Sequence, residues 1–166
     1  MKKIMFALLA MVTALLQTAG AQNRNVSPQL SPILTQYYSV KEALTNNDAA
    51  AAAARSGKLA KTIQDITISA LPAAEQAAFE PLSGKLLTSA QTIAGANDLN
   101  KQRDAFKTLS DDLTILVKAV PLSASPVYQQ YCPMKKAYWL SDNNTIKNPY
   151  YGKQMLTCGK VTGTIE

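Results

Sequence analysis

Apolar residues recur at spacings of three and four between residues 28 and 120, and this periodicity constrains the fold more than any other feature. Such spacing places side chains on one face of an α-helix. Four stretches show it, separated by polar or proline-containing turns, and together they predict an antiparallel up-and-down four-helix bundle. The predicted apolar faces are Leu30, Ile33, Tyr37, Val40 and Leu44; Leu59, Ile63 and Ile66; Phe79, Leu82, Leu86, Ala90 and Ile93; and Leu99, Phe106, Leu109, Leu113, Leu116 and Val120.

The turns between these stretches carry recognisable helix signals. Asp48 follows a polar turn and precedes the alanine run 49–54, so it is a natural N-cap for the second helix. Pro72 suits the start of the third helix, and Pro81 within that helix predicts a kink. Residues 95–98 provide a stop and a new cap before the fourth helix.

The N-terminus is typical of an export signal. Lys2 and Lys3 precede an apolar stretch, residues 4–16, which is short for a membrane span, and Ala19-Gly20-Ala21 supplies small residues for cleavage before Gln22. We therefore expect residues 1–21 to be a signal peptide and the mature protein to be periplasmic, with no membrane anchor after cleavage. The mature chain of 166 − 21 = 145 residues is long enough for one domain with a substantial core.

Composition argues against two classes of function. The net charge is +6, or +4 after loss of Lys2 and Lys3, and the remaining lysines and arginines are dispersed, which argues against nucleic-acid binding. The chain contains no histidine, so Ser-His-Asp and Cys-His catalytic arrangements are impossible. We therefore predict that the protein is not an enzyme.

The composition changes after the predicted bundle (residues 22–120). Residues 121–166 are rich in turn-forming residues, aromatic side chains and sulfur, and we expect an irregular segment, made of short strands or loops, docked on the bundle as part of the same domain. The fold class predicted for the whole chain is therefore all-α. The aromatic and sulfur-bearing residues of this segment include Tyr128, Tyr131, Cys132, Met134, Tyr138, Trp139, Met155 and Cys158.

The two cysteines each have a methionine within three residues. Cys132 and Met134 are separated by one residue, so an extended segment would point both side chains to one side. Met155 and Cys158 are three residues apart, so a helical turn would place them on a shared face. Two thiols and two thioethers form a soft ligand set that suits Cu(I) or Ag(I). These four residues are the predicted metal ligands.

The same cysteines are equally compatible with a structural disulfide. An oxidising compartment favours disulfides, and a bond across 158 − 132 = 26 residues would contribute about 3 kcal/mol through the unfolded state. A reversible disulfide could also control access of a metal to the thiols. For the metal site, lysines 135, 136 and 153 are expected to lower the thiol pKa values by favouring the thiolate.

The C-terminal segment resembles domain-of-unknown-function family 3347. The resemblance is carried by Tyr131-Cys132-Pro133-Met134, Ala137-Tyr138-Trp139-Leu140-Ser141, Asn148-Pro149-Tyr150-Tyr151-Gly152, Met155 and Cys158-Gly159. Members are exported bacterial proteins, and similar domains occur fused to periplasmic adaptor subunits of heavy-metal efflux pumps, which implies copper or related metals. Cys132-Pro133-Met134 is also similar to a motif of short heavy-metal-binding domains, in which a histidine usually follows the triplet. Lys135 stands in that place here, so a histidine-dependent site does not carry over.

Two functions follow from the sequence. The first is a periplasmic soft-metal-binding protein, acting as a carrier or an accessory of heavy-metal efflux with an efflux adaptor or another envelope protein as partner. The alternative is a non-enzymatic envelope interaction protein in which the Cys132–Cys158 pair is a structural disulfide.

Overall fold

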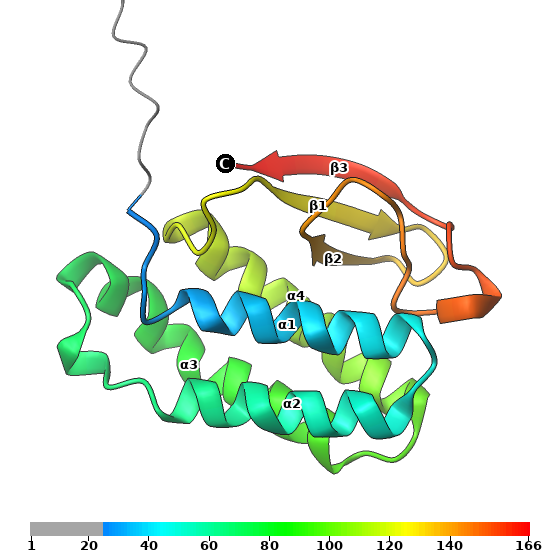
Figure 1. Ribbon diagram of the computed structural model, residues 1–166, viewed down its shortest axis with the longest axis horizontal. Helices are drawn as coiled ribbons and strands as arrows, with labels where there is room; N and C mark the ends of the chain where they lie inside the picture. Colours follow the sequence, from blue (N-terminus) through cyan, green and yellow to red (C-terminus); the bar gives the residue numbers. More distant parts are fainter. Residues whose placement is uncertain (1–24) are drawn as a thin grey trace, which may run out of the picture.

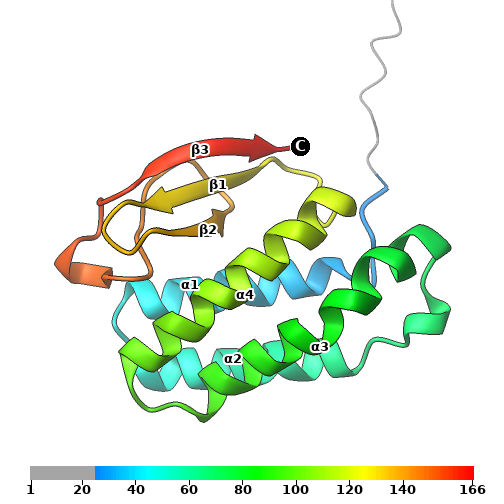
Figure 2. The same ribbon diagram turned by 180° about the vertical axis from the view of Figure 1, so that it is seen from behind.

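The computed structural model describes residues 25–166. The predicted signal peptide and its cleavage site before Gln22 lie outside the described residues. Four helices run up and down in chain order, α1 (Ser31–Thr45), α2 (Ala49–Gln64), α3 (Ala73–Gly95) and α4 (Leu99–Ala119), and each packs mainly on its neighbour in the chain (Figures 1 and 2). A short 3-10 helix, η1 (Ile68–Ala70), connects α2 to α3. The predicted bundle is confirmed.

Helices α2 and α4 begin directly after the predicted capping residues Asp48 and Asp98. The Asp48 carboxylate accepts a hydrogen bond from the amide of Ala51 at 2.8 Å, and Asp98 accepts one from the amide of Lys101 at 2.9 Å. Each cap satisfies an amide that has no partner within its own helix. Helix α3 begins directly after Pro72 and continues through Pro81 without ending. Within residues 25–166, no helix has the length and apolar character that crossing a bilayer requires.

The C-terminal segment contains a three-stranded antiparallel sheet, which corrects the all-α prediction. Strands β1 (Val127–Cys132), β2 (Ala137–Ser141) and β3 (Lys160–Ile165) are arranged in the order β2-β1-β3. The alternation that identifies a strand is broken in β1, where pairing with β3 shifts register between Gln129 and Gln130. Gln130 is fully buried, and its side-chain Nε2 donates hydrogen bonds to the carbonyls of Asn143 and Thr145. A strand with a polar residue facing inwards has no simple sequence signature.

The sheet covers α1 and α4 and shares their buried core (Figures 1 and 2). Trp139 and Leu140 of β2 are both 0 % exposed. Tyr37 of α1 stacks on Phe106 of α4 at 4.9 Å between ring centroids, and its hydroxyl oxygen accepts a hydrogen bond from the amide of Leu140 at 3.0 Å. The predicted apolar face of α1 is therefore buried partly against the other helices and partly against the sheet.

Candidate metal site at the cysteine pair

The fold brings the two cysteines together. Cys132 is the last residue of β1 and is fully buried, whereas Cys158 is half-buried in the turn that precedes β3. Tyr131 pairs with Lys160 in the antiparallel register of β1 and β3. Cys132 directly follows Tyr131 and Cys158 lies two residues before Lys160, so this pairing brings the two cysteines near each other. Both are free thiols, and the Cys132 thiol is near enough to raise the pKa of Cys158.

Gly159 permits this close approach. A Cβ atom at Gly159 would lie 2.9 Å from the backbone oxygen of Tyr131 and 2.8 Å from an atom of the Trp139 ring. Its φ of +155° is also one that other residues rarely adopt. A glycine is therefore needed for the backbone that carries Cys158 to lie against the end of β1.

Asn148 holds the two cysteine segments in place and was not identified from the sequence. Its side chain is fully buried, and Nδ2 donates to Cys132 Sγ at 3.2 Å and to the carbonyl oxygen of Cys158 at 2.7 Å. Its Oδ1 accepts a hydrogen bond from the amide of Tyr150 at 2.8 Å. The Asn-Pro dipeptide indicates a turn, but nothing in the sequence shows that the asparagine side chain faces inwards.

Met155 lies close to Cys158 along the chain. The short 3-10 helix η2 (Gly152–Gln154) ends at the residue directly before Met155. The backbone amide of Cys158 donates a hydrogen bond to the Met155 carbonyl at 3.0 Å. Met155 and Cys158 are therefore the first and last residues of one tight turn, and both are half-buried. This is close to the single helical turn expected for the pair.

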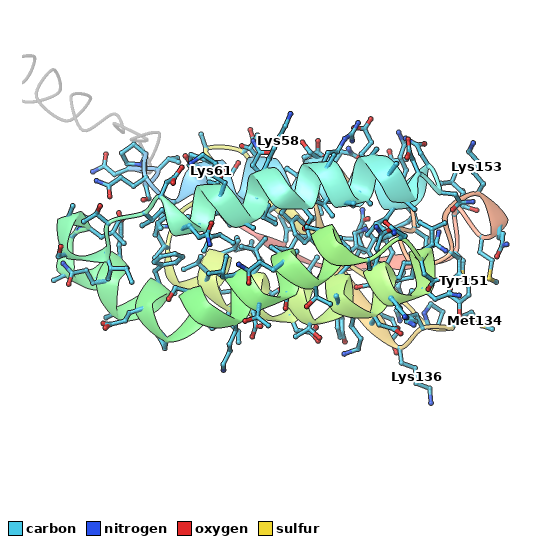
Figure 3. The ribbon with its side chains drawn as sticks, turned by 90° about the horizontal axis from the view of Figure 1, so that it is seen from below. Lys58, Lys61, Met134, Lys136, Tyr151 and Lys153 are labelled. Carbon is cyan, nitrogen blue, oxygen red and sulfur yellow. The ribbon has the colours of Figure 1, made fainter. Side chains whose placement is uncertain are left out.

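Met134 is not gathered with the other sulfur atoms. The chain is not extended here as expected, because β1 ends at Cys132 and residues 133–136 form a turn in which the amide of Lys135 donates to Cys132 Sγ at 3.4 Å. Met134 is 61 % exposed and lies at the end of the molecule with Lys136 and Lys153 (Figure 3). Cys132 and Cys158 are thus neighbours, Met155 precedes Cys158 by one turn, and Met134 is exposed to solvent.

The lysines of this region do not activate the Cys158 thiol as expected. Loss of water around Cys158, together with the neighbouring Cys132 thiol, raises the pKa of Cys158 above its ordinary value. Lys135 is directed elsewhere, since its Nζ lies 2.6 Å from Asp104 Oδ1 on α4. The prediction that nearby lysines lower the thiol pKa is therefore wrong for Cys158, and a metal ion would have to displace its proton.

The sulfur donors of this region suit a soft ion better than a hard one. Within residues 25–166, no three side chains of histidine, cysteine, aspartate or glutamate come together as a metal cluster. The side-chain donors that could hold a metal at the cysteine pair are therefore the two thiols, and the nearest methionine along the chain is Met155. Thiolate and thioether ligands select Cu(I) and similar ions, whereas Mg²⁺ and Ca²⁺ require oxygen ligands.

Comparison with known proteins identifies the family. The profile described as "Protein of unknown function (DUF3347)" matches residues 33–124, which is 92 of the 166 residues. The chain belongs to the DUF3347 family. The matched range covers the four helices and ends before β1, so the cysteine pair of this DUF3347 protein lies outside it. No curated protein and no solved structure matched the chain.

Proposed function

We propose that this protein binds Cu(I) or Ag(I) between the thiolates of Cys132 and Cys158 and serves as a carrier or accessory in heavy-metal handling. The observation that carries the proposal is the close approach of these two cysteines, which are 26 residues apart in sequence (158 − 132) and are both hydrogen-bonded by the Asn148 side chain. Two adjacent thiolates provide the minimum soft ligand set for a monovalent d10 ion.

The two cysteines differ in a way that suits metal exchange. Cys132 is fixed at the end of a strand, where it is fully buried and accepts a hydrogen bond from Asn148. Cys158 is half-buried on a turn, so it can move outwards to admit the ion and release its proton. Met155, on the same turn, is the candidate third ligand. Met134, exposed at the rim, is the first sulfur that an incoming ion or a partner would meet.

The resemblance to domains fused to efflux adaptors suggests the partner. An exported carrier with a half-exposed thiol can pass Cu(I) to another soft site by exchange of sulfur ligands, and a periplasmic efflux adaptor or another envelope protein is the proposed recipient. We further propose that the protein is not an enzyme and acts in the periplasm.

The same close approach supports a second candidate, a disulfide between Cys132 and Cys158 in a non-enzymatic envelope interaction protein. The bond would join the end of β1 to the turn before β3, and closing this loop would contribute about 3 kcal/mol. An oxidising compartment favours this state, and binding of Cu(I) requires the reduced one.

Competition for Cu(I) separates the two functions. The reduced chain from Gln22 onwards is titrated anaerobically with Cu(I) against a chromogenic chelator, alongside Cys158→Ser, Met155→Leu and Met134→Leu. We expect capture of one equivalent, loss of capture in Cys158→Ser, and about tenfold weaker binding, or about 1.4 kcal/mol, in Met155→Leu. Met134→Leu is the matched control and should bind almost as well as wild type, because Met134 is 61 % exposed.

Failure to compete for Cu(I) would reject the metal site. The disulfide candidate makes opposite predictions: no capture by the reduced chain, two thiols lost on mild oxidation, and Met→Leu variants indistinguishable from wild type. Under that outcome, the oxidised protein should unfold at a higher urea concentration than the reduced protein.

A further inference from the structure

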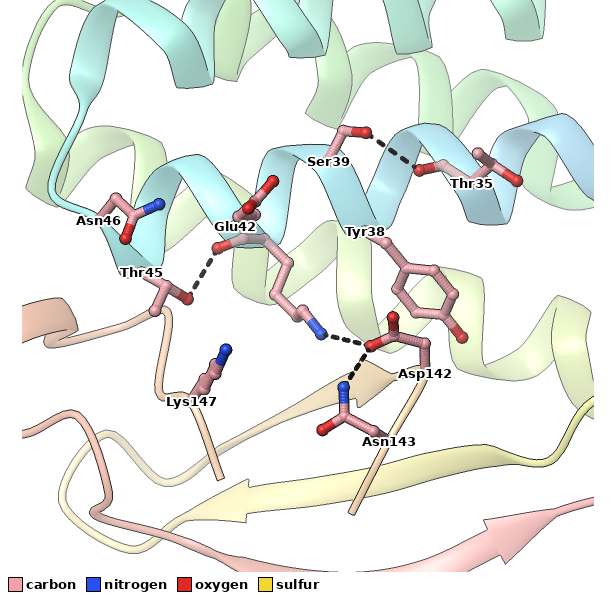
Figure 4. Close-up of a pocket in the computed structure, with 10 residues that line it drawn as sticks. Thr35, Tyr38, Ser39, Glu42, Thr45, Asn46, Asp142, Asn143 and Lys147 are labelled. Carbon is pink, nitrogen blue, oxygen red and sulfur yellow. Dashed lines mark hydrogen bonds and ion pairs between the residues drawn. The ribbon is translucent and has the colours of Figure 1, made fainter. Parts of the chain in front are cut away.

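A second site is present on α1, away from the cysteine pair. One face of α1 and the loop that follows β2 enclose an open cleft of about 460 Å³ (Figure 4). Thr35, Ser39, Glu42 and Asn46 line it from the helix, and Asp142, Asn143 and Lys147 line it from the loop. Its volume lies within the roughly 300–1,000 Å³ range of small-molecule sites.

A buried ammonium group forms one wall of the cleft. Lys41 is only 7 % exposed, and its Nζ donates to Ser141 Oγ at 3.0 Å and to Asp142 Oδ1 at 3.3 Å. The same nitrogen lies 5.2 Å from the centroid of the Tyr38 ring. Lys41 is therefore held in a fixed position beside the cleft by three neighbours.

A second ammonium group faces the first. Lys147 is exposed, makes no hydrogen bond or ion pair with the described part of the chain, and points across the cleft towards α1 (Figure 4). Lys41 and Lys147 line the same cleft. Burial lowers the pKa of Lys41, Asp142 opposes this effect, and the charge of Lys147 lowers it further.

The charges of the cleft do not cancel. Asp142 balances one of the two lysines, and the Glu42 carboxylate is already paired with Arg55 Nη1 at 2.9 Å. One positive charge, that of Lys147, is left without a counterion among the described residues. This single uncompensated positive charge favours a ligand with one negative charge, because the second charge of a dianion would have no counterion in the cleft.

We propose that this cleft binds a small hydroxylated carboxylate, with its carboxylate group beside Lys147 and Lys41. Hydroxyl groups of the ligand would meet the polar side chains of α1. The side-chain amide of Asn46 makes no hydrogen bond with other described residues, and the Glu42 carboxylate, which is 65 % exposed, can accept further hydrogen bonds. The proposal does not depend on metal binding at the cysteine pair.

The test is an NMR titration of the ¹⁵N-labelled, reduced chain with sodium glucuronate at constant ionic strength. Glucose and inorganic phosphate are titrated separately as probes of the hydroxyl groups and of the charge. We expect saturable shifts at the amides of residues 42–46 and 142–147 with glucuronate, and no saturation with glucose. Lys147→Gln should weaken binding by about tenfold.

The matched control is Lys58→Gln. Lys58 is an exposed lysine on α2 that makes no ion pair with other described residues, and this substitution changes the net charge by the same amount (Figure 3). It should bind glucuronate like wild type. Three results would overturn the proposal: no saturable shift with glucuronate, equal weakening in both lysine variants, or tighter binding of glucose or phosphate than of glucuronate.

Discussion

Replacing Asn148 with alanine removes the side chain that joins the two cysteine segments. The substitution leaves the Tyr150 amide without the acceptor that lies 2.8 Å away and the Cys158 carbonyl without the donor at 2.7 Å. A buried backbone group left without a partner costs about 1–3 kcal/mol. The contact with Cys132 Sγ at 3.2 Å is also lost. Together, these losses predict destabilisation by about 3 kcal/mol.

Urea denaturation of the reduced protein measures this loss. With an m-value of about 1.5 kcal/mol/M, destabilisation by 3 kcal/mol lowers the unfolding midpoint by about 2 M. Asn144→Ala is the matched control, because Asn144 is exposed and its side chain makes no hydrogen bond with other described residues. It should change stability by less than about 0.5 kcal/mol. An Asn148→Ala midpoint equal to that of Asn144→Ala would refute the role assigned to Asn148.

Three further predictions concern the glycine contact, the buried tyrosines and the thiol protons. Gly159→Ala should destabilise the protein by about 2 kcal/mol, because the added Cβ would lie 2.9 Å from the Tyr131 backbone oxygen. Gly57→Ala, in an open helical position, should instead stabilise the protein by about 0.5–1 kcal/mol. Similar urea midpoints for the two variants would contradict this prediction. Burial raises the pKa of Tyr37, Tyr38 and Tyr150 above 10, so the folded state keeps protons that the unfolded state loses, and stability should be full below pH 10 and fall above it. The lowered pKa of Lys41 has the opposite effect on stability as pH approaches 10.5, but Lys41 is one group and the tyrosines are three. Urea midpoints that stay constant from pH 8 to pH 11 would contradict the prediction. Cu(I) should bind more tightly at pH 8 than at pH 6, because the raised pKa of Cys158 means that the metal must displace a proton from this thiol. Chelator competition at the two pH values measures the difference. Equal affinities would argue against thiolate ligands.

The helical half of the fold was predictable because its signals are local. Residues such as Ile33, Tyr37 and Leu44 lie on one face through helical spacing alone, and all three are fully buried. The Asp48 and Asp98 caps are also local, since each carboxylate bonds an amide three residues ahead. Such features need no knowledge of distant parts of the chain.

The sheet and the details of the site depend on contacts that sequence patterns do not record. The β1–β2 turn uses Lys136 at a φ of +53°, a conformation usually signalled by glycine or asparagine. Strand β3 is largely exposed and pairs with a strand about 30 residues earlier. The approach of the two cysteines follows from that pairing, whereas the exposed position of Met134 follows from the β1–β2 turn.

The central claim is that two thiolates hold a soft metal ion, and copper-edge X-ray absorption of the Cu(I)-loaded, reduced protein tests it most directly. We predict a first coordination shell of two or three sulfur atoms and no nitrogen or oxygen, with the metal lost from Cys132→Ser. A shell containing nitrogen or oxygen, or copper that does not remain bound after desalting, would contradict the assignment of Cys132 and Cys158 as metal ligands.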